Sequence, residues 1–224
     1  MTRSIVTGGF GVLGAAVVNE LLAQGHRVAA IDLAPAPAGS AATVSIGGID
    51  MTDESAVAAA YADAATALGG LEGLVNVAGG FTWEPVETGS AATWDSMYAM
   101  NVRTAAISSR VALAHLSAGA IVNVGAAAAT GPGPGMAPYA ASKAGVMALT
   151  ESLAEELRTR GIRVNAILPT ILDTPANRRA MPDADTSEWV DPASAARAIG
   201  FLLSPASAAI TGVGIRLSLG GCAP

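Results

Sequence analysis

The stretch Thr7-Gly8-Gly9-Phe10-Gly11-Val12-Leu13-Gly14 decides the fold. It lies between an apolar run, 3–7, and a segment with helical spacing of apolar residues, 14–24. Its Gly-x-Gly-x-x-Gly pattern, at positions 9, 11 and 14, permits a tight turn and a close approach of the backbone to a pyrophosphate. The N–H groups at the start of the helix point toward negative charge. The stretch therefore predicts a strand, a phosphate-binding loop and a helix; an ordinary glycine-rich turn is the alternative.

Two carboxylates follow at the positions where a dinucleotide needs them. Asp32 ends the next apolar run, 27–32, where a carboxylate can bind the hydroxyls of the adenosine ribose. A carboxylate there repels a 2′-phosphate, and no basic residue lies between Arg27 and Ala91, so we predict NADH in preference to NADPH. Asp50 is a candidate acceptor for the adenine amino group, with helix capping as an equal alternative.

Apolar runs bounded by glycine alternate with helical segments along the whole chain. This alternation predicts an α/β fold in one domain, 1–224, with a doubly wound parallel sheet flanked by helices on both faces. Pro35, Pro37 and Gly39 predict a shortened or missing helix after the second strand. We expect strands at 3–7, 27–32, 43–46, 73–77, 120–124, 163–168 and 212–218, and helices at 14–24, 53–68, 93–115 and 138–160.

Charge and cysteine content narrow the class of function. The formal net charge is −6 and no run of Lys or Arg occurs, which argues against nucleic acid or an anionic membrane as a partner. No apolar stretch is long enough to span a bilayer, and the glycines of the loop would break a signal-peptide helix. The only cysteine, Cys222, excludes an internal disulfide and a cysteine metal site, so we expect no metal and a cytoplasmic location.

Tyr139-Ala-Ala-Ser-Lys143 is the candidate catalytic motif. A spacing of four places both side chains on one face of a helix. A phenol is a weak acid near neutral pH, and an adjacent ammonium group is expected to lower its pKa and make it a useful proton donor. Lys143 can also hold the ribose of a nicotinamide. A surface tyrosine and lysine is the alternative for so short a pattern.

Taken together with the glycine loop and Asp32, these residues resemble the short-chain dehydrogenase/reductase family over almost the whole chain. The further matches are Asn76-Val-Ala78-Gly79, Asn101-Val, and Pro169 with Thr174. The resemblance implies a Rossmann-type fold, an oxidoreductase, and a homodimer or homotetramer formed through the two long helices. It also implies that 76–79 supports the central strand beside the cofactor, that Asn101 holds a water in a proton relay, and that Thr174 contacts the nicotinamide.

Two positions depart from the usual family pattern. The hydroxyl residue expected 13 positions before the tyrosine is replaced by Ala126, and Val12 stands where a glycine is common. Loss of one donor to a developing oxyanion costs about 10² to 10³ in rate, so reduction of a simple ketone should be handicapped.

Both departures resemble the quinonoid dihydropteridine reductase branch of the family. Similar segments are Val77–Phe81, Gly135–Tyr139 and Leu172–Trp189, the last forming an expected substrate loop at about 170–190. Phe81 and Trp83 are candidates to flank a flat ring beside Tyr139, although packing under the substrate loop is an equal alternative for Trp83. Trp189 is expected to anchor that loop.

These observations give three hypotheses for function. The first is an NADH-dependent reductase that transfers hydride to a quinonoid dihydropterin, an acceptor electrophilic enough to need no hydroxyl at position 126. The second is a short-chain reductase for another carbonyl or imine substrate. The third, suggested by Ala126, is a redox-inactive nucleotide-binding protein; Tyr139, Lys143 and Asn101 argue against it.

Overall fold

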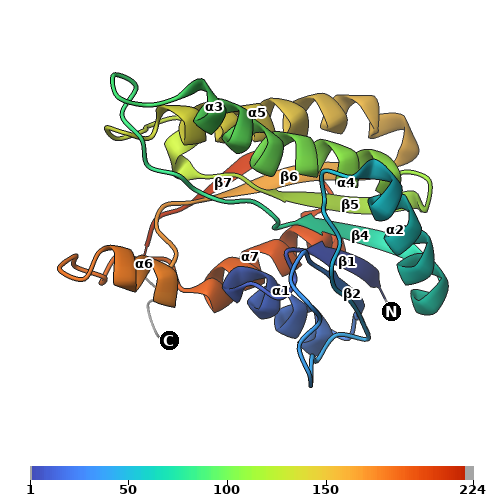
Figure 1. Cartoon of the computed structure of the whole chain (residues 1–224). Helices are drawn as coiled ribbons and strands as arrows, with labels where there is room; N and C mark the ends of the chain where they lie inside the picture. The colour runs from blue at the N-terminus through green and yellow to red at the C-terminus, as the bar shows by residue number, and fades with distance from the viewer. Residues whose placement is uncertain (1, 220–224) are drawn as a thin grey trace.

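A seven-stranded parallel sheet forms the centre of the computed structural model, which describes residues 2–219 (Figure 1). The strand order is β3-β2-β1-β4-β5-β6-β7. All neighbouring strands are parallel, which confirms the predicted fold class. The strands are β1 (Arg3–Thr7), β2 (Arg27–Ile31), β3 (Val44–Ile46), β4 (Leu71–Asn76), β5 (Leu116–Val124), β6 (Ile162–Pro169) and β7 (Gly214–Leu217).

Helices cover both faces of the sheet (Figure 1). They are α1 (Val12–Ala23), α2 (Glu54–Leu68), α3 (Ala91–Met97), α4 (Thr104–Ala112), α5 (Ala137–Glu156), α6 (Pro175–Ala180) and α7 (Pro192–Leu203). One apolar cluster lies between the sheet and α2, α4 and α5, and another lies between the sheet and α1 and α7. Because both faces are covered, successive residues of a strand, such as Ile5 and Val6, are both fully buried.

The prediction of one continuous helix at 93–115 is wrong. The structure has α3, then a π-helix η1 (Tyr98–Arg103), then α4, and β5 begins at Leu116. The wider π turn contains Asn101, whose side chain is buried. The helix predicted at 138–160 ends at Glu156 and continues as the short 3₁₀ segment η3 (Arg158–Arg160).

Other local predictions are confirmed, and two helices had been missed. Asp53 caps α2 by accepting from the N–H groups of Ser55 and Ala56, and no helix separates β2 from β3. The helices α6 and α7 were not predicted. Their starts carry a recognisable signal, because Thr174 and Asp191 each cap a helix whose first residue is proline.

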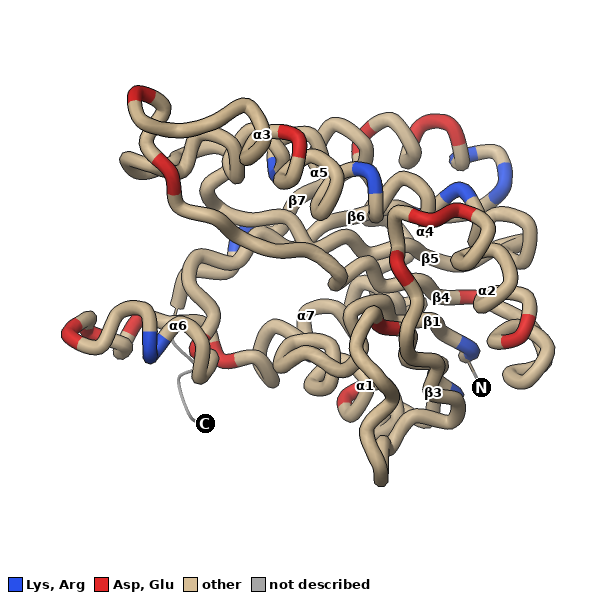
Figure 2. The backbone as a smooth tube through the Cα atoms, in the orientation of Figure 1, with Lys and Arg blue, Asp and Glu red and all other residues tan. Residues whose placement is uncertain are grey.

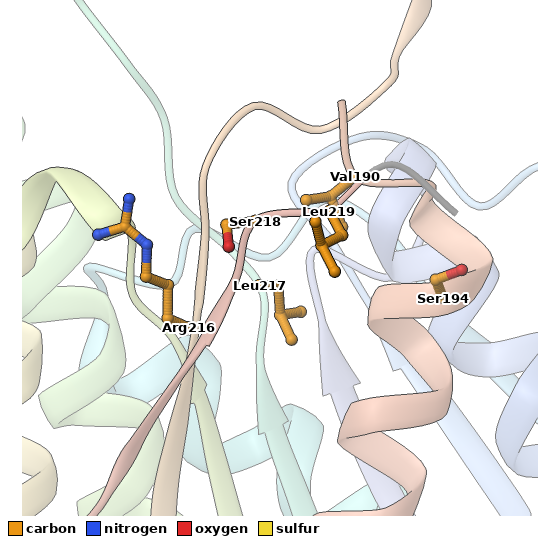
Figure 3. A pocket seen from close by; sticks show the side chains of 6 residues that line it. All are labelled: Val190, Ser194, Arg216, Leu217, Ser218 and Leu219. Carbon is orange, nitrogen blue, oxygen red and sulfur yellow. The ribbon is translucent and has the colours of Figure 1, made fainter. Parts of the chain in front are cut away.

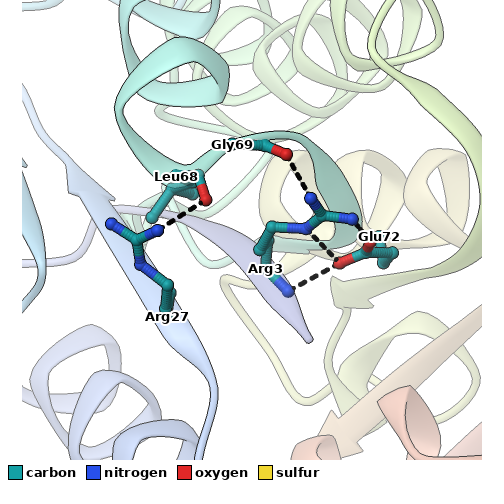
Figure 4. Close-up of polar contacts among 5 residues, drawn as sticks. All are labelled: Arg3, Arg27, Leu68, Gly69 and Glu72. Carbon is teal, nitrogen blue, oxygen red and sulfur yellow. Dashed lines mark hydrogen bonds and ion pairs between the residues drawn. The ribbon is translucent and has the colours of Figure 1, made fainter. Parts of the chain in front are cut away.

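One ion pair and several hydrogen bonds join the amino ends of the strands to the end of α2 (Figure 4). The Arg3 side chain pairs with Glu72 and also binds the carbonyl of Gly69. The Arg27 guanidinium donates to the carbonyl of Leu68 at 2.9 Å. These contacts attach the end of α2 to β1, β2 and β4, and they lie at the edge opposite the glycine loop.

Lys and Arg are scattered along the backbone (Figure 2). No helix within residues 2–219 combines the length and the apolar character needed to cross a bilayer. Cys222 lies outside the described residues.

Candidate active site

The loops after β1 and β4 meet at the carboxyl edge of the sheet. The hydroxyl oxygen of Thr7, the last residue of β1, accepts from the N–H groups of Val77 and Ala78, each at 3.2 Å. Gly8 has a φ of +62°, and a Cβ there would lie 2.8 Å from the nitrogen of Ala78. The strands β1 and β4 are neighbours in the sheet although they are not consecutive in the chain. The crevice between the loops that follow two such strands is where open α/β sheets bind ligands. Thr7 was not singled out from the sequence.

The glycines bring α1 directly against this loop. A Cβ on Gly14 would lie 1.9 Å from the Gly8 carbonyl oxygen, and one on Gly9 would lie 2.7 Å from the Cβ of Ala30. The cap residue Gly11 has no side chain to bind the first N–H groups of α1. The start of the helix is therefore free of a side-chain cap and suits a phosphate.

Asp32 is fixed at the end of β2. One carboxylate oxygen accepts from the N–H of Phe10 at 2.9 Å, and the other accepts from the N–H of Ala34 at 3.0 Å. Arg27 cannot offset this charge, because its guanidinium binds the carbonyls of Ala67 and Leu68 at the opposite edge of the sheet.

A cavity of about 680 Å³ runs along this edge. Its lining includes ten of the predicted cofactor residues: Gly8, Gly11, Val12, Leu13, Gly14, Asp32, Asp50, Ala78, Gly79 and Thr174. No Lys or Arg is among the residues that line it, so phosphates there would depend on backbone N–H groups. The size, the glycine-lined wall and the fixed carboxylate fit a nicotinamide dinucleotide.

Five predicted cofactor residues do not line this cavity: Gly9, Phe10, Asn76, Lys143 and Pro169. Gly9 packs on Ala30, and Phe10 contributes its N–H to Asp32. Asp50 does line the cavity, and its carboxylate also accepts from the N–H and hydroxyl of Thr52. These hydrogen bonds hold the pKa of Asp50 below its ordinary value.

Asn76 belongs to a buried polar network that connects two neighbouring strands to two helices. Its amide donates to Asn123 Oδ1 at 2.8 Å and to Ser109 Oγ at 3.0 Å, and its oxygen accepts from Ser108. Asn123 in turn donates to Thr150 at 2.9 Å. The network joins β4 and β5 to α4 and α5, in agreement with support of the central strand.

Tyr139 and Lys143 lie one turn apart on α5, which confirms their expected placement. The Lys143 Nζ lies 5.8 Å from the centroid of the Tyr139 ring and donates to the Val124 carbonyl at 2.8 Å. A Cβ on Gly79 would lie 3.5 Å from this Nζ. Gly79 lines the cavity, so the lysine lies directly behind the cavity wall.

The expected lowering of the tyrosine pKa is wrong for the protein without a bound cofactor. Burial raises the pKa of Tyr139 to about 12. Burial lowers the pKa of Lys143 to about 8. Both shifts favour the neutral forms, because removal from water penalises phenolate and ammonium alike. The ammonium points at the Val124 carbonyl instead of the phenol oxygen.

Asn101 ties three segments together inside the site. Its amide oxygen accepts from the Gly80 N–H, and its amide nitrogen donates to the Gly80 carbonyl, both at 3.1 Å. The same nitrogen donates to Ser142 Oγ at 3.0 Å, and Ser142 donates to the Tyr139 carbonyl at 2.7 Å. Ser142 was not predicted as a site residue, although it lies inside the Tyr-Lys motif. The predicted water relay at Asn101 stays a prediction.

The predicted substrate residues fall into two groups. Phe81 packs edge-on against Tyr139, with ring centroids 4.9 Å apart and planes at 87°, and Ala126 is buried. Trp83 is 59% exposed and so is not packed under the substrate loop, and its predicted place beside a substrate ring stays a prediction. Its indole N–H donates to the Pro134 carbonyl at 2.9 Å, and the ring covers Gly135.

The two ends of the expected substrate loop contact each other. Leu172 and Val190 form an isolated bridge, and Trp189 is 5% exposed. Thr174 caps α6 by accepting from the Asn177 N–H at 3.2 Å while it lines the large cavity. The burial of Trp189 agrees with its expected role as an anchor.

A smaller cavity of about 220 Å³ lies beside this loop (Figure 3). It is lined by Val190, Ser194, Arg216, Leu217, Ser218 and Leu219. It contains none of the predicted site residues, and the Arg216 guanidinium extends away from Leu217 and Leu219. The predicted cofactor residues that line a cavity are all found at the larger one.

Comparison with known proteins identifies the family. The family model for short chain dehydrogenase matches residues 3–185. The chain belongs to this family. It is an oxidoreductase with the Rossmann-type fold of short-chain dehydrogenases.

The relatives within the family act on varied substrates. The chain is 34% identical to 2-(S)-hydroxypropyl-CoM dehydrogenase 3 of Xanthobacter autotrophicus, over 96% of this chain and 94% of the relative. It is also 34% identical to D-threitol dehydrogenase of Mycolicibacterium smegmatis, over 97% and 91%. The 3-ketoacyl-(acyl-carrier-protein) reductase of Brucella melitensis complexed with NADH superposes with a TM-score of 0.86 at 27% identity, covering 96% of each chain. None of these three is a dihydropteridine reductase, so closeness to that branch stays a prediction.

Proposed function

We propose that this protein is an NADH-dependent short-chain reductase for a carbonyl or imine substrate that is conjugated and electrophilic. The observation that carries the proposal is the placement of Tyr139, partly buried, with the buried Lys143 and Asn101 beside a cavity that fits a dinucleotide. NADH, when bound, supplies the hydride for reduction. The protein supplies the proton and the geometry.

Tyr139 is the proton donor in this proposal. Its phenol makes no hydrogen bond to any of residues 2–219, and its high pKa keeps the proton on the oxygen at neutral pH. The phenol is thus free to donate to an oxygen or nitrogen of the substrate as that atom gains negative charge. Asn101 and Ser142 hold the turn of α5 that carries it.

Ala126 supports the restriction to an activated acceptor. A methyl group at this buried position cannot donate a hydrogen bond to the substrate oxygen. The phenol would then be the single side-chain donor, which favours substrates whose electrophilic carbon needs little further polarisation. A quinonoid dihydropterin meets this condition, and it is the second candidate because of the segment 172–189 and Phe81 beside Tyr139.

The proposed preference for NADH depends on charge at the adenosine end. Asp32 is held toward the cavity by two N–H groups, and Arg27 is engaged at the far edge of the sheet. A 2′-phosphate would face a carboxylate with no cation to offset it. The NADH complex of the Brucella relative is consistent with this choice.

The test is an acceptor panel with NADH and NADPH in parallel. It should include conjugated ketones, cyclic imines, unactivated ketones, and quinonoid dihydropterin generated from a tetrahydropterin by an external oxidant. We expect NADH oxidation above background with activated acceptors and much slower oxidation with unactivated ketones. Turnover with dihydropterin alone would favour the second candidate. Tight NADH binding without turnover on any acceptor would instead support the redox-inactive alternative.

A further inference from the structure

A small clasp joins two loops beside Tyr139. The indole N–H of Trp83 donates to the Pro134 carbonyl, 51 positions along the chain, at 2.9 Å. The next residue, Glu84, donates its backbone N–H to the Gly135 carbonyl at 2.8 Å. The segment after β4 is therefore attached at two points to the segment that leads into α5.

Gly135 has no side chain and so leaves room for the indole ring of Trp83. Its φ is +73°, a conformation that glycine adopts without strain. A Cβ at this position would lie 2.3 Å from two atoms of the Trp83 ring, closer than any side chain allows. The ring therefore packs directly on the glycine backbone, and the contact depends on both residues.

The two segments joined by this clasp each lead to Tyr139. Phe81, two positions before Trp83, packs edge-on against the Tyr139 ring at 4.9 Å. Gly135, four positions before Tyr139, leads into the first turn of α5. The cap residue of that turn is Met136, whose side chain provides no capping hydrogen bond. The clasp is thus a direct restraint on where α5 starts and on where Phe81 lies.

We propose that Trp83 is a positioning residue for the proton donor, acting on Tyr139 through Gly135 and through Phe81. The proposal rests on the proposed function, in which Tyr139 gives the proton. Trp83 need not touch the substrate for this role, because its polar N–H is already used by Pro134. A misplacement of about 1 Å in a reacting group costs roughly 10²-fold in rate, so a loosened clasp should lower kcat.

The kinetic test compares Trp83→Ala and Trp83→Phe with Trp94→Phe. Trp94 is a matched control because it is also a partly exposed tryptophan, at 41%, and its indole makes no hydrogen bond within residues 2–219. We expect Trp83→Ala to lower kcat by about 10- to 100-fold, with the Kd for NADH and the substrate KM nearly unchanged. Trp83→Phe keeps a ring on Gly135 without the N–H, and its kcat should lie between those of wild type and Trp83→Ala. Wild-type kcat in both Trp83 variants, or an equal loss in Trp94→Phe, would overturn the proposal.

A substrate-free measurement separates this proposal from the proposed function. Protein labelled with 3-fluorotyrosine gives a ¹⁹F resonance for Tyr139 that the Tyr139→Phe variant assigns. In Trp83→Ala, and to a smaller extent in Trp83→Phe, its titration midpoint should shift toward lower pH, because water reaches the loosened ring. If no acceptor is turned over, this shift still supports the positioning role while the proposed function fails. An unchanged midpoint in both Trp83 variants would refute the positioning role whatever the acceptor panel shows.

Discussion

Tyr139 and Lys143 are both held in surroundings that favour their uncharged forms. Burial raises the pKa of the phenol to about 12 and lowers the pKa of the lysine to about 8. The phenol thus keeps its proton available at neutral pH, while the lysine is close to its midpoint. A charge brought near the buried lysine by a bound ligand would have a large effect, because charges are screened less at a buried position.

The Tyr139→Phe variant tests the proton donor directly. Removing the phenol oxygen keeps the ring that packs against Phe81, so the fold and the cavity should persist. We expect kcat to fall by about 10²- to 10⁴-fold, the usual contribution of a general acid. Steady-state NADH oxidation measures the loss, and fluorescence titration should give an unchanged Kd for NADH. Retained turnover would mean that another group or water donates the proton.

The Lys143→Met variant tests the cost of burying an amine. The difference between a pKa of about 8 in the fold and the ordinary 10.5 corresponds to about 3 kcal/mol at 1.36 kcal/mol per pH unit. Loss of the hydrogen bond to the Val124 carbonyl offsets about 1 kcal/mol of this. We therefore expect the variant to be inactive but about 2 kcal/mol more stable at pH 7.

The pH dependence of that stability difference has a definite sign. Below pH 8 the lysine is protonated in both states, so the native state bears the full cost of a buried charge. Between about pH 8 and 10.5 only the unfolded state holds the proton, so the wild type gains stability as the pH rises. Denaturant unfolding at several pH values should show the advantage of Lys143→Met fading across this window. A constant difference would contradict the burial argument.

Among the elements, the junction of β1 and α1 depends most on glycine. In Gly14→Ala the added Cβ would lie 1.9 Å from the Gly8 carbonyl, which forces α1 away from the loop. We expect a clear fall in Tm and loss of NADH binding. Gly11→Ala is the matched control, since its Cβ would lie 3.4 Å from the nearest atom, the same carbonyl oxygen. It should keep the wild-type Tm and weaken only NADH binding; equal Tm losses in both variants would contradict this account.

The strands were the part of the fold most accessible from the sequence. Runs such as Ile5-Val6 and Val28–Ile31 are buried on both faces, so hydrophobicity without alternation identifies them. The Tyr139 to Lys143 spacing likewise fixes one helix face. The glycine spacing indicated the loop, because close packing at Gly8 and Gly14 leaves no room for a Cβ.

What the sequence did not show depends on contacts between distant segments. The amino-acid composition of residues 98–103 does not indicate a π-helix. The Asn101 side chain in this segment binds Gly80 and Ser142, which are distant in the chain. The orientation of Lys143 toward Val124 and of Trp83 toward Pro134 is likewise set by tertiary packing. These contacts explain why the raised pKa of Tyr139 and the hydrogen bond of Trp83 to Pro134 could not be predicted from the sequence.

Over the whole molecule, stabilising and functional contacts lie at opposite edges of one sheet. Arg3, Arg27 and Glu72 form contacts at the amino edge. The glycine loop and Asp32 line the cavity at the carboxyl edge, where Lys143 also binds the last residue of β5. Changes at one edge should therefore be separable from effects at the other. The predicted homodimer or homotetramer, formed through residues 93–115 and 138–160, stays a prediction that sedimentation velocity can test.

Cofactor binding should stabilise the entire domain. A ligand that binds only the folded state at 100 times its Kd adds about 2.7 kcal/mol to the free energy of unfolding. For a chain of this length each kcal/mol corresponds to roughly 2–4 °C, so saturating NADH should raise Tm by about 5–10 °C. At equal concentration NADPH should raise it less, because its 2′-phosphate faces the Asp32 carboxylate.

An Asp32→Ser variant provides the control for that measurement. It replaces the carboxylate with a neutral hydroxyl, so the difference between the Tm shifts with NADH and NADPH should shrink. The shift with NADH should itself decrease, since the ribose loses its carboxylate acceptor. Equal shifts for the two cofactors in the wild type would show that Asp32 does not discriminate between them, and the preference for NADH would have to be abandoned.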